Sequence, residues 1–257
     1  VSSFIIHFSI HRPSIFHPFF IHRAVPMILI VDFGSQYTLL IAKTLRQVGV
    51  YSEVCPYHRM HEVYPQCTDC TGVILSGGPC SVNDSDAPRV EWESLSVPVL
   101  GICYGAQLMA SCLSGVTVNS SGASSGAEYG EQTLDWTPDS VTDAWCATWS
   151  SQTTTSPPFS SATASSGTAS SATVWMSHGD HIVVSSILDD ADEDKRPSMV
   201  PLAYSSAATT SGSSERVLAA FAIRPSGQQP SRYGVQFHPE VTHTSHGASL
   251  LHTFATQ

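Results

Sequence analysis

The sequence predicts an α/β fold in which helices cover both faces of a mostly parallel central sheet. From Met27 onward, short continuous apolar runs recur along the chain, which is typical of strands buried on both faces. Between several of these runs, apolar residues recur at helical spacing. Strands and helices that alternate in this way indicate a parallel sheet, because a helical crossover returns the chain to the same edge.

The first half of the chain follows this pattern closely. ILIVDF (28–33) is predicted as a buried strand, and the helical pattern of 35–49 follows it, with Ser35 placed to cap the helix and Gly49 to end it. Further apolar runs predict strands at 50–55, 71–79 and 97–103. A helix is predicted at 104–113, with Gly115 as its stop signal.

The middle of the chain interrupts the pattern. Between Ala147 and Thr173, 16 of 27 residues are Ser or Thr. Such a stretch buries too little apolar surface to offset the entropy of ordering it, so we expect a disordered insertion at about 138–173. Strand-like runs then resume, and a last helical pattern closes the chain: runs at 174–184, 199–206, 216–223 and 232–241, and a helix at about 246–254.

Composition limits the partners and the compartment. A formal net charge of −10 argues against a nucleic-acid partner, which would require a basic face, and we expect no membrane partner. Seven irregularly spaced cysteines do not form a disulfide framework, so a reducing, cytoplasmic setting is expected. Residues 1–26 contain no Asp or Glu. They are interpreted as an N-terminal extension, either a transit-like organellar leader or upstream sequence that an incorrect gene model includes, ahead of one domain at 27–257.

Cys103 stands in the pattern G-I-C-Y-G (101–105), directly after an apolar run and at the start of a helical pattern. Small residues on both sides permit a tight strand-to-helix turn, and the positive end of the helix favours a thiolate at the sulfur. The same turn geometry carries the nucleophile of the G-x-S-x-G motif. The pentapeptide alone leaves two interpretations open, a nucleophile and a small buried thiol.

Two further strand ends supply what a nucleophile would need. In Q-F-H-P-E (236–240), His238 is followed two positions later by Glu240, which suits a base and the carboxylate that orients it. In L-S-G-G-P (75–79), the glycines leave backbone N–H groups free to turn toward a developing oxyanion. Together these features favour the nucleophile interpretation of Cys103.

The order of these three elements resembles the class I, or triad, glutamine amidotransferases, whose sheet is flavodoxin-like. Three finer stretches are similar to the GMP synthase branch of that family: DFGSQYT (32–38), WMSHGDHI (175–182) and VQFHPEVTHT (235–244). The resemblance covers roughly Met27 to Phe254, apart from the Ser/Thr-rich stretch.

The resemblance implies a role for each matching residue. Cys103 would attack the side-chain amide of glutamine, His238 would transfer protons, and Glu240 would orient His238. The backbone N–H groups of Gly78 and Tyr104 would bind the oxyanion. Three further residues would contact the substrate or relay to a synthetase part: Gln107, His178 and Asp180. The resemblance implies no metal site.

The resemblance also implies a partner that this sequence does not contain. In the GMP synthase branch, an ATP-pyrophosphatase domain or subunit with an S-G-G-x-D-S loop uses the ammonia to aminate XMP. We therefore expect no cofactor on this chain, with ATP and Mg²⁺ only on the missing synthetase part. The alternatives are a glutaminase of anthranilate or carbamoyl-phosphate synthesis type, a free-standing thiol hydrolase acting on another amide, and a non-catalytic regulatory module.

Overall fold

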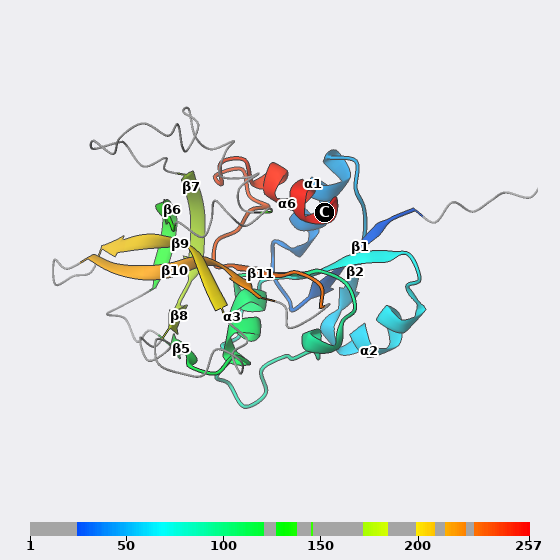
Figure 1. The fold of residues 1–257 in the computed structure, drawn as a ribbon, viewed down its shortest axis with the longest axis horizontal. Coiled ribbons are helices and arrows are strands. Elements are labelled where there is room, and N and C mark those ends of the chain that lie inside the picture. The colour runs from blue at the N-terminus through cyan, green and yellow to red at the C-terminus, as the bar shows by residue number, and fades with distance from the viewer. Residues whose placement is uncertain are drawn as a thin grey trace, which may run out of the picture.

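The computed structural model describes residues 25–120, 127–137, 145, 172–184, 199–208, 214–224 and 229–257. Within these ranges, a nine-stranded sheet runs through the molecule in the order β2-β1-β3-β4-β11-β10-β9-β6-β7, and β5 and β8 form a separate two-stranded sheet (Figure 1). The strands are β1 Met27–Asp32, β2 Tyr51–Pro56, β3 Cys70–Leu75, β4 Val99–Ile102, β5 Val116–Ser120, β6 Glu128–Trp136, β7 Ala172–His178, β8 Asp180–Val184, β9 Met199–Ala208, β10 Ser214–Ile223 and β11 Arg232–Val235. The helices are α1 Thr38–Gln47, α2 Met60–Val63, α3 Tyr104–Ser111 and α6 Gly247–Ala255.

The sheet has two halves of different character. Strands β2, β1, β3, β4 and β11 pair in parallel, as the repeated strand–helix pattern predicts. Strands β10, β9, β6 and β7 continue the sheet in antiparallel pairing. The predicted α/β class with a parallel core is confirmed, and the complete sheet is mixed.

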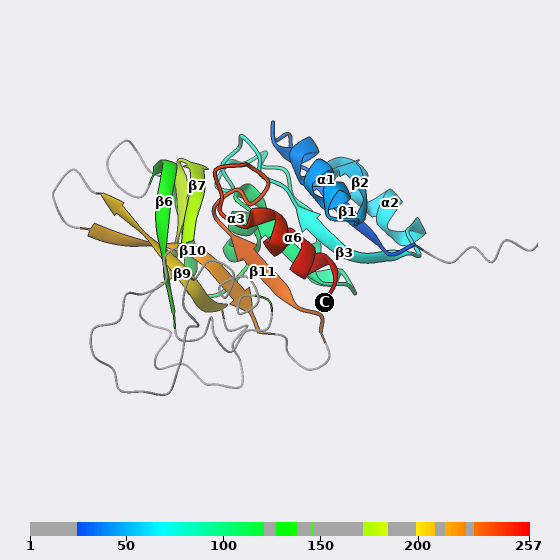
Figure 2. The same cartoon turned by 90° about the horizontal axis from the view of Figure 1, so that it is seen from above.

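Alternation along β1 explains why helices cover both faces of the parallel half. Ile28 and Ile30 pack with one apolar cluster, to which α1 and α6 contribute. Leu29 and Val31 pack with the other, to which α3 contributes. All four side chains are buried, and Figure 2 shows α1 and α6 together on one side of the sheet.

The first predicted helix starts later than its sequence pattern suggests. Helix α1 begins at Thr38 after Tyr37 as N-cap, so the prediction that Ser35 caps it is wrong. Ser35 Oγ instead accepts a hydrogen bond from the Tyr37 N–H at 3.1 Å, which stabilises a local turn. The predicted end is close, because Gly49 takes a positive φ of +84° just beyond the helix.

The apolar run 174–184 belongs to two strands and not to one. Strand β7 pairs with β6 in the large sheet up to His178, and Asp180 opens β8 in the small sheet. Gly179 lies at the corner between them. Strands β5 and β6 were not predicted, because their exposed faces interrupt the apolar runs.

Most of two predicted segments lies outside the described residues: positions 1–24 of the N-terminal extension and nearly all of 138–173. Inside the predicted insertion, Trp145 is buried. Its ring lies 4.4 Å from that of Tyr233, and its Nε1 donates to the Leu250 carbonyl at 3.3 Å. Ala172 and Thr173 belong to β7 and not to the insertion. Among the described helices, none combines the length and the apolar character needed to cross a membrane.

Candidate active site

Cys103 occupies a sharp turn between β4 and α3. Its backbone has φ +50° and ψ −106°, one of two positive φ values at non-glycine positions of the described chain. The Cys103 N–H donates to the Val235 carbonyl at 2.8 Å, which ties the turn to the neighbouring strand β11. Its carbonyl accepts from the Gln107 N–H at 3.0 Å and so begins the hydrogen bonding of α3. Cys103 therefore lies at the positive end of that helix.

Gly101 and Gly105, on either side of the Cys103 turn, lie against neighbouring backbone that leaves no room for a side chain. A Cβ on Gly101 would lie 2.6 Å from the Ala106 nitrogen. A Cβ on Gly105 would lie 2.3 Å from the Leu75 carbonyl oxygen. Any side chain at either position would thus collide with backbone, which explains the small residues that the sequence places around the turn.

His238 and Glu240 follow β11 and form a buried pair. His238 Nδ1 lies 2.8 Å from Glu240 Oε1, and the two side chains are 3% and 0% exposed. The His238 N–H donates to the Trp175 carbonyl at 3.0 Å, and Thr244 Oγ1 donates to the His238 carbonyl at 2.6 Å. Both backbone groups of His238 are held, so its ring is fixed in position.

The His238 ring also interacts with Cys103. Burial alone would lower the pKa of His238, but hydrogen bonds to the Cys103 thiol and to Glu240, together with the charges of these groups, raise it to about 10. The arrangement therefore favours an imidazolium at neutral pH. Such a ring can hold a thiolate and later return the proton.

A pocket of about 370 Å³ opens over Cys103. It brings together five of the eight predicted site residues: Gly78, Cys103, Gln107, His178 and Asp180. The rest of its lining consists of Pro79, Cys80, Ser81, Tyr129, Ser177 and Gly179. Several polar groups of the predicted residues already have protein partners. Gln107 Nε2 donates to the Asp180 carbonyl at 2.9 Å, and Asp180 Oδ2 accepts from Ser81 Oγ at 2.5 Å.

The predicted oxyanion residues lie on two sides of the turn. Gly78 follows β3, where a Cβ would lie 3.1 Å from the Phe33 carbonyl oxygen and 3.3 Å from Tyr104 Cγ. The Tyr104 phenol is committed elsewhere, since it donates to the Pro88 carbonyl at 2.6 Å. Among the hydrogen bonds of the described ranges, none uses the backbone N–H of Gly78 or of Tyr104.

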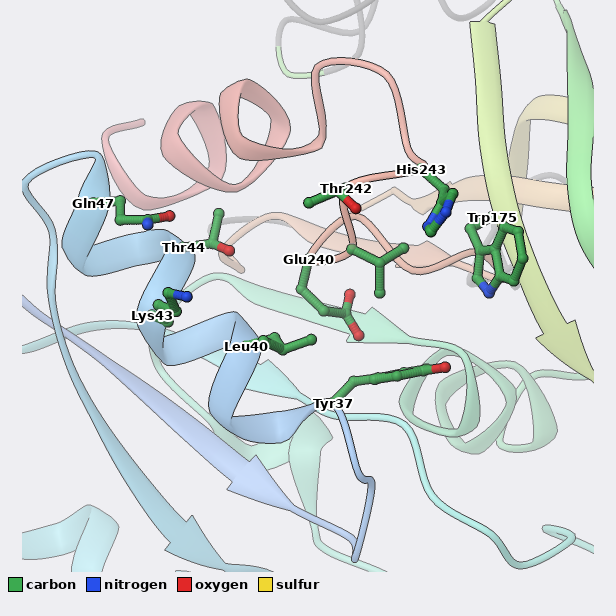
Figure 3. A pocket seen from close by; sticks show the side chains of 10 residues that line it. Tyr37, Leu40, Lys43, Thr44, Gln47, Trp175, Glu240, Thr242 and His243 are labelled. Carbon is green, nitrogen blue, oxygen red and sulfur yellow. The ribbon is translucent and has the colours of Figure 1, made fainter.

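A second cavity, of about 390 Å³, lies on the Glu240 side of the pair and is lined by α1 and by the segment after β11 (Figure 3). The Tyr37 ring contacts the His238 ring edge-on at 4.9 Å between centroids. Sequence reasoning did not assign a role to Tyr37, Thr244 or Glu128, whose carboxylate contacts His178. Tyr37 and Thr244 lie within the stretches 32–38 and 235–244, which was their only signal in the sequence, whereas Glu128 lies in no such stretch. No group of three His, Cys, Asp or Glu side chains suited to a metal gathers anywhere in the described chain.

Comparisons with known proteins identify the family and the relatives of this chain. The family model described as "Glutamine amidotransferase class-I" matches residues 29–257. A GMP synthase [glutamine-hydrolyzing] of Nitrobacter hamburgensis is 39% identical over 229 residues, which cover 88% of this chain and 34% of that protein. A protein of the same name from Nitratiruptor sp. is 36% identical over 230 residues, covering 89% of this chain and 36% of that protein. The chain thus spans about a third of the length of these curated relatives.

Solved structures show the same fold. A glutamine amidotransferase from Thermotoga maritima superposes with a TM-score of 0.54 at 16% identity, covering 84% of this chain and 77% of that one. PurLQS from the same organism gives 0.56 at 14% identity, covering 90% and 98%. Together with the family match over nearly the whole chain, these findings establish that the chain belongs to the class I glutamine amidotransferase family.

Proposed function

We propose that this chain hydrolyses glutamine to glutamate and ammonia through Cys103, His238 and Glu240. The thiolate of Cys103 attacks the side-chain amide carbon, and a tetrahedral intermediate forms. His238 then donates its proton to the leaving ammonia, and a γ-glutamyl thioester remains on Cys103. Water, deprotonated by His238, attacks the thioester and releases glutamate, which restores the thiol.

One observation carries this proposal: Cys103 is held at a positive φ at the start of α3, beside a buried His238 ring that is bonded to Glu240 and whose pKa the Cys103 thiol helps to raise. A cysteine kept merely for packing requires neither a strained backbone nor a charged histidine beside it. Both features are expected of a nucleophile whose proton must leave and return.

The surrounding pocket supplies the remaining functions. The backbone N–H groups of Gly78 and Tyr104 bind the oxyanion of the intermediate, since neither is used by another described group. Gln107, His178 and Asp180 form the wall that positions glutamine. Their hydrogen bonds to one another and to Ser81 stabilise that wall before substrate arrives.

The relatives suggest where the ammonia goes. Their names identify them as GMP synthases, and this chain matches about a third of their length. We therefore infer that the domain at 27–257 delivers ammonia to an ATP-pyrophosphatase unit that binds ATP and Mg²⁺ and converts XMP to GMP. That unit would be a further part of the same protein or a separate subunit.

Glutamine hydrolysis measured on matched cysteine variants tests the first claim. Cys103→Ala is expected to reduce glutamate formation to background, whereas Cys112→Ala, at the exposed end of α3, is expected to match the unmodified chain. Equal rates for the Cys103 variant and the unmodified chain would overturn the proposal. Labelling of Cys103 by an electrophilic glutamine analogue provides a second readout, which does not require turnover.

The branch is tested by adding a GMP synthetase unit together with ATP, Mg²⁺ and XMP. The expected result is faster glutamine hydrolysis and formation of GMP from glutamine nitrogen. If chorismate or bicarbonate acceptor systems stimulate the chain and the XMP system does not, the assignment to the GMP branch is wrong.

A further inference from the structure

A second buried carboxylate–histidine pair lies behind the pocket wall. Glu128 opens β6 and His178 closes β7, and the two residues stand directly opposite each other in the sheet. Their side chains are each 1% exposed, with 3.2 Å between His178 Nε2 and Glu128 Oε2. Ser205 Oγ, from β9, donates to the same carboxylate oxygen at 2.9 Å. Nothing in the proposed chemistry uses Glu128, although a buried carboxylate is costly to maintain.

The partners of His178 determine where its hydrogen lies. Nδ1 is 2.8 Å from the Asp180 carbonyl oxygen. A carbonyl oxygen can only accept, so Nδ1 must carry a hydrogen. The contact between Nε2 and Glu128 Oε2 then requires a second hydrogen between those two atoms, whichever of them bears it. Glu128 therefore fixes the orientation of the His178 ring, in which Nδ1 donates to the Asp180 carbonyl.

The group that His178 holds is part of the pocket wall. The Asp180 carbonyl accepts from His178 and also from Gln107 on α3, at 2.8 and 2.9 Å. At this corner the chain leaves the large sheet and enters the small one. On the other side of the corner, the Ser177 carbonyl oxygen lies 3.9 Å from Cys103 Sγ. The position of the corner thus determines the space between the wall and the nucleophile.

We propose that Glu128 is a positioning residue, which acts through His178 to fix the wall 177–180 against Cys103 and so determines the affinity of the site for glutamine. The inference rests on the proposed function, because it takes glutamine as the ligand of the pocket. Glu128 contacts neither the ligand nor Cys103. Its removal should therefore affect glutamine binding while the reactivity of the thiol is retained.

Protection of Cys103 from alkylation tests this without requiring turnover. Iodoacetamide is small enough to react with the thiol, and bound glutamine should slow that reaction. From the glutamine concentration that halves the rate, an apparent Kd follows for each variant. Glu128→Ala, which leaves Nε2 unpaired, is expected to raise this Kd about tenfold, as the loss of one buried hydrogen bond implies. The rate without glutamine should stay within about twofold.

Two further variants separate positioning from a general loss of structure. In Glu128→Gln, the amide NH₂ can donate to Nε2 and to Ser205 Oγ, and Ser205 can turn its hydrogen toward the Val217 carbonyl, already 3.5 Å away. Nδ1 keeps its hydrogen, so this variant should bind glutamine within about twofold of the unmodified chain. The matched control is Glu131→Gln, at an exposed position of the same strand, which should have no effect.

The outcomes distinguish the two proposals. If glutamine does not protect the unmodified chain, the proposed function fails. If it protects the unmodified chain and the Glu128→Ala variant equally, or if Glu128→Gln binds as weakly as Glu128→Ala, the positioning role of Glu128 is wrong. Should Glu128→Ala not fold, Ser205→Ala removes one donor from the carboxylate. About threefold weaker protection is then expected, and unchanged protection would overturn the inference.

Discussion

The backbone strain at Cys103 should make the Cys103→Gly variant more stable than the Cys103→Ala variant. At φ +50° and ψ −106°, Cys103 lies outside the left-handed helical region that side chains tolerate best. A residue held in so sparsely populated a region costs up to about 3 kcal/mol. Glycine relieves that cost, but it loses about 1 kcal/mol through the greater freedom of the unfolded chain. Losing the Cβ costs about 0.8 kcal/mol more. Cys103→Gly should therefore be about 1 kcal/mol more stable than Cys103→Ala.

Urea unfolding of both variants, followed by circular dichroism, measures the difference. A gain of about 1 kcal/mol corresponds to a rise in melting temperature of about 2–4 °C for a chain of this size. Neither variant has a thiol at position 103, so the comparison is independent of the charge on the sulfur. The same pair of substitutions at Lys43, exposed on α1, provides the control. There the backbone is helical, and the glycine variant should be less stable by about 1 kcal/mol.

The reasoning fails if Cys103→Gly is less stable than Cys103→Ala. That result would mean that the turn is not strained and that surrounding contacts favour the observed backbone. If glycine is more stable than alanine at both positions, the effect is not specific to the turn at Cys103. Only opposite signs at Cys103 and Lys43 assign the strain to the nucleophile position.

Three other substitutions test separate parts of the structure. Gly105→Ala places a Cβ 2.3 Å from the Leu75 carbonyl oxygen and should destabilise the fold by about 3 kcal/mol in urea unfolding, because backbone cannot rotate away. Arg232→Met removes the guanidinium that donates to the carbonyls of Val97, Leu95 and Glu93 at 2.6, 2.7 and 3.4 Å, with an expected loss of about 1–3 kcal/mol. Glu240→Gln removes the negative charge that, together with the Cys103 thiol, raises the pKa of His238 to about 10. In the unmodified chain, the contribution of charged His238 to the free energy of unfolding is complete below pH 6.5 and is lost as pH rises through about 10. In the Glu240→Gln variant, NMR titration should show that the His238 ring loses its proton at a lower pH.

The sequence determines the parallel half of the fold well. Strands β1, β3 and β4 are buried on both faces, and their apolar runs predict them. Strand β6 has one exposed face, and its polar residues interrupt the apolar pattern from which strands are read. Periodicity also does not show that the run 174–184 passes from the large sheet to the small one. The corner at Gly179 is required only by the position of the small sheet in three dimensions.

The site was predictable where chemistry restricts the residue type. Gly101 and Gly105 are required by backbone contacts of 2.6 and 2.3 Å that exclude a Cβ, so small residues around a cysteine are informative. Glu128 gives no such signal, because a glutamate on an apolar–polar strand is ordinary in sequence. Its importance follows only from the cross-strand pairing that places it against His178.

The order of strands explains why residues from distant parts of the chain meet at one sulfur. Strands β3, β4 and β11 are parallel neighbours, so their carboxyl ends lie at the same edge of the sheet. Gly78 follows β3, Cys103 follows β4 and His238 follows β11. Cys103 therefore stands on the central one of these three strands, with Gly78 on one side and His238 on the other. The antiparallel half adds what these strands lack, because β7 carries Ser177 and His178 across Cys103 and closes the pocket.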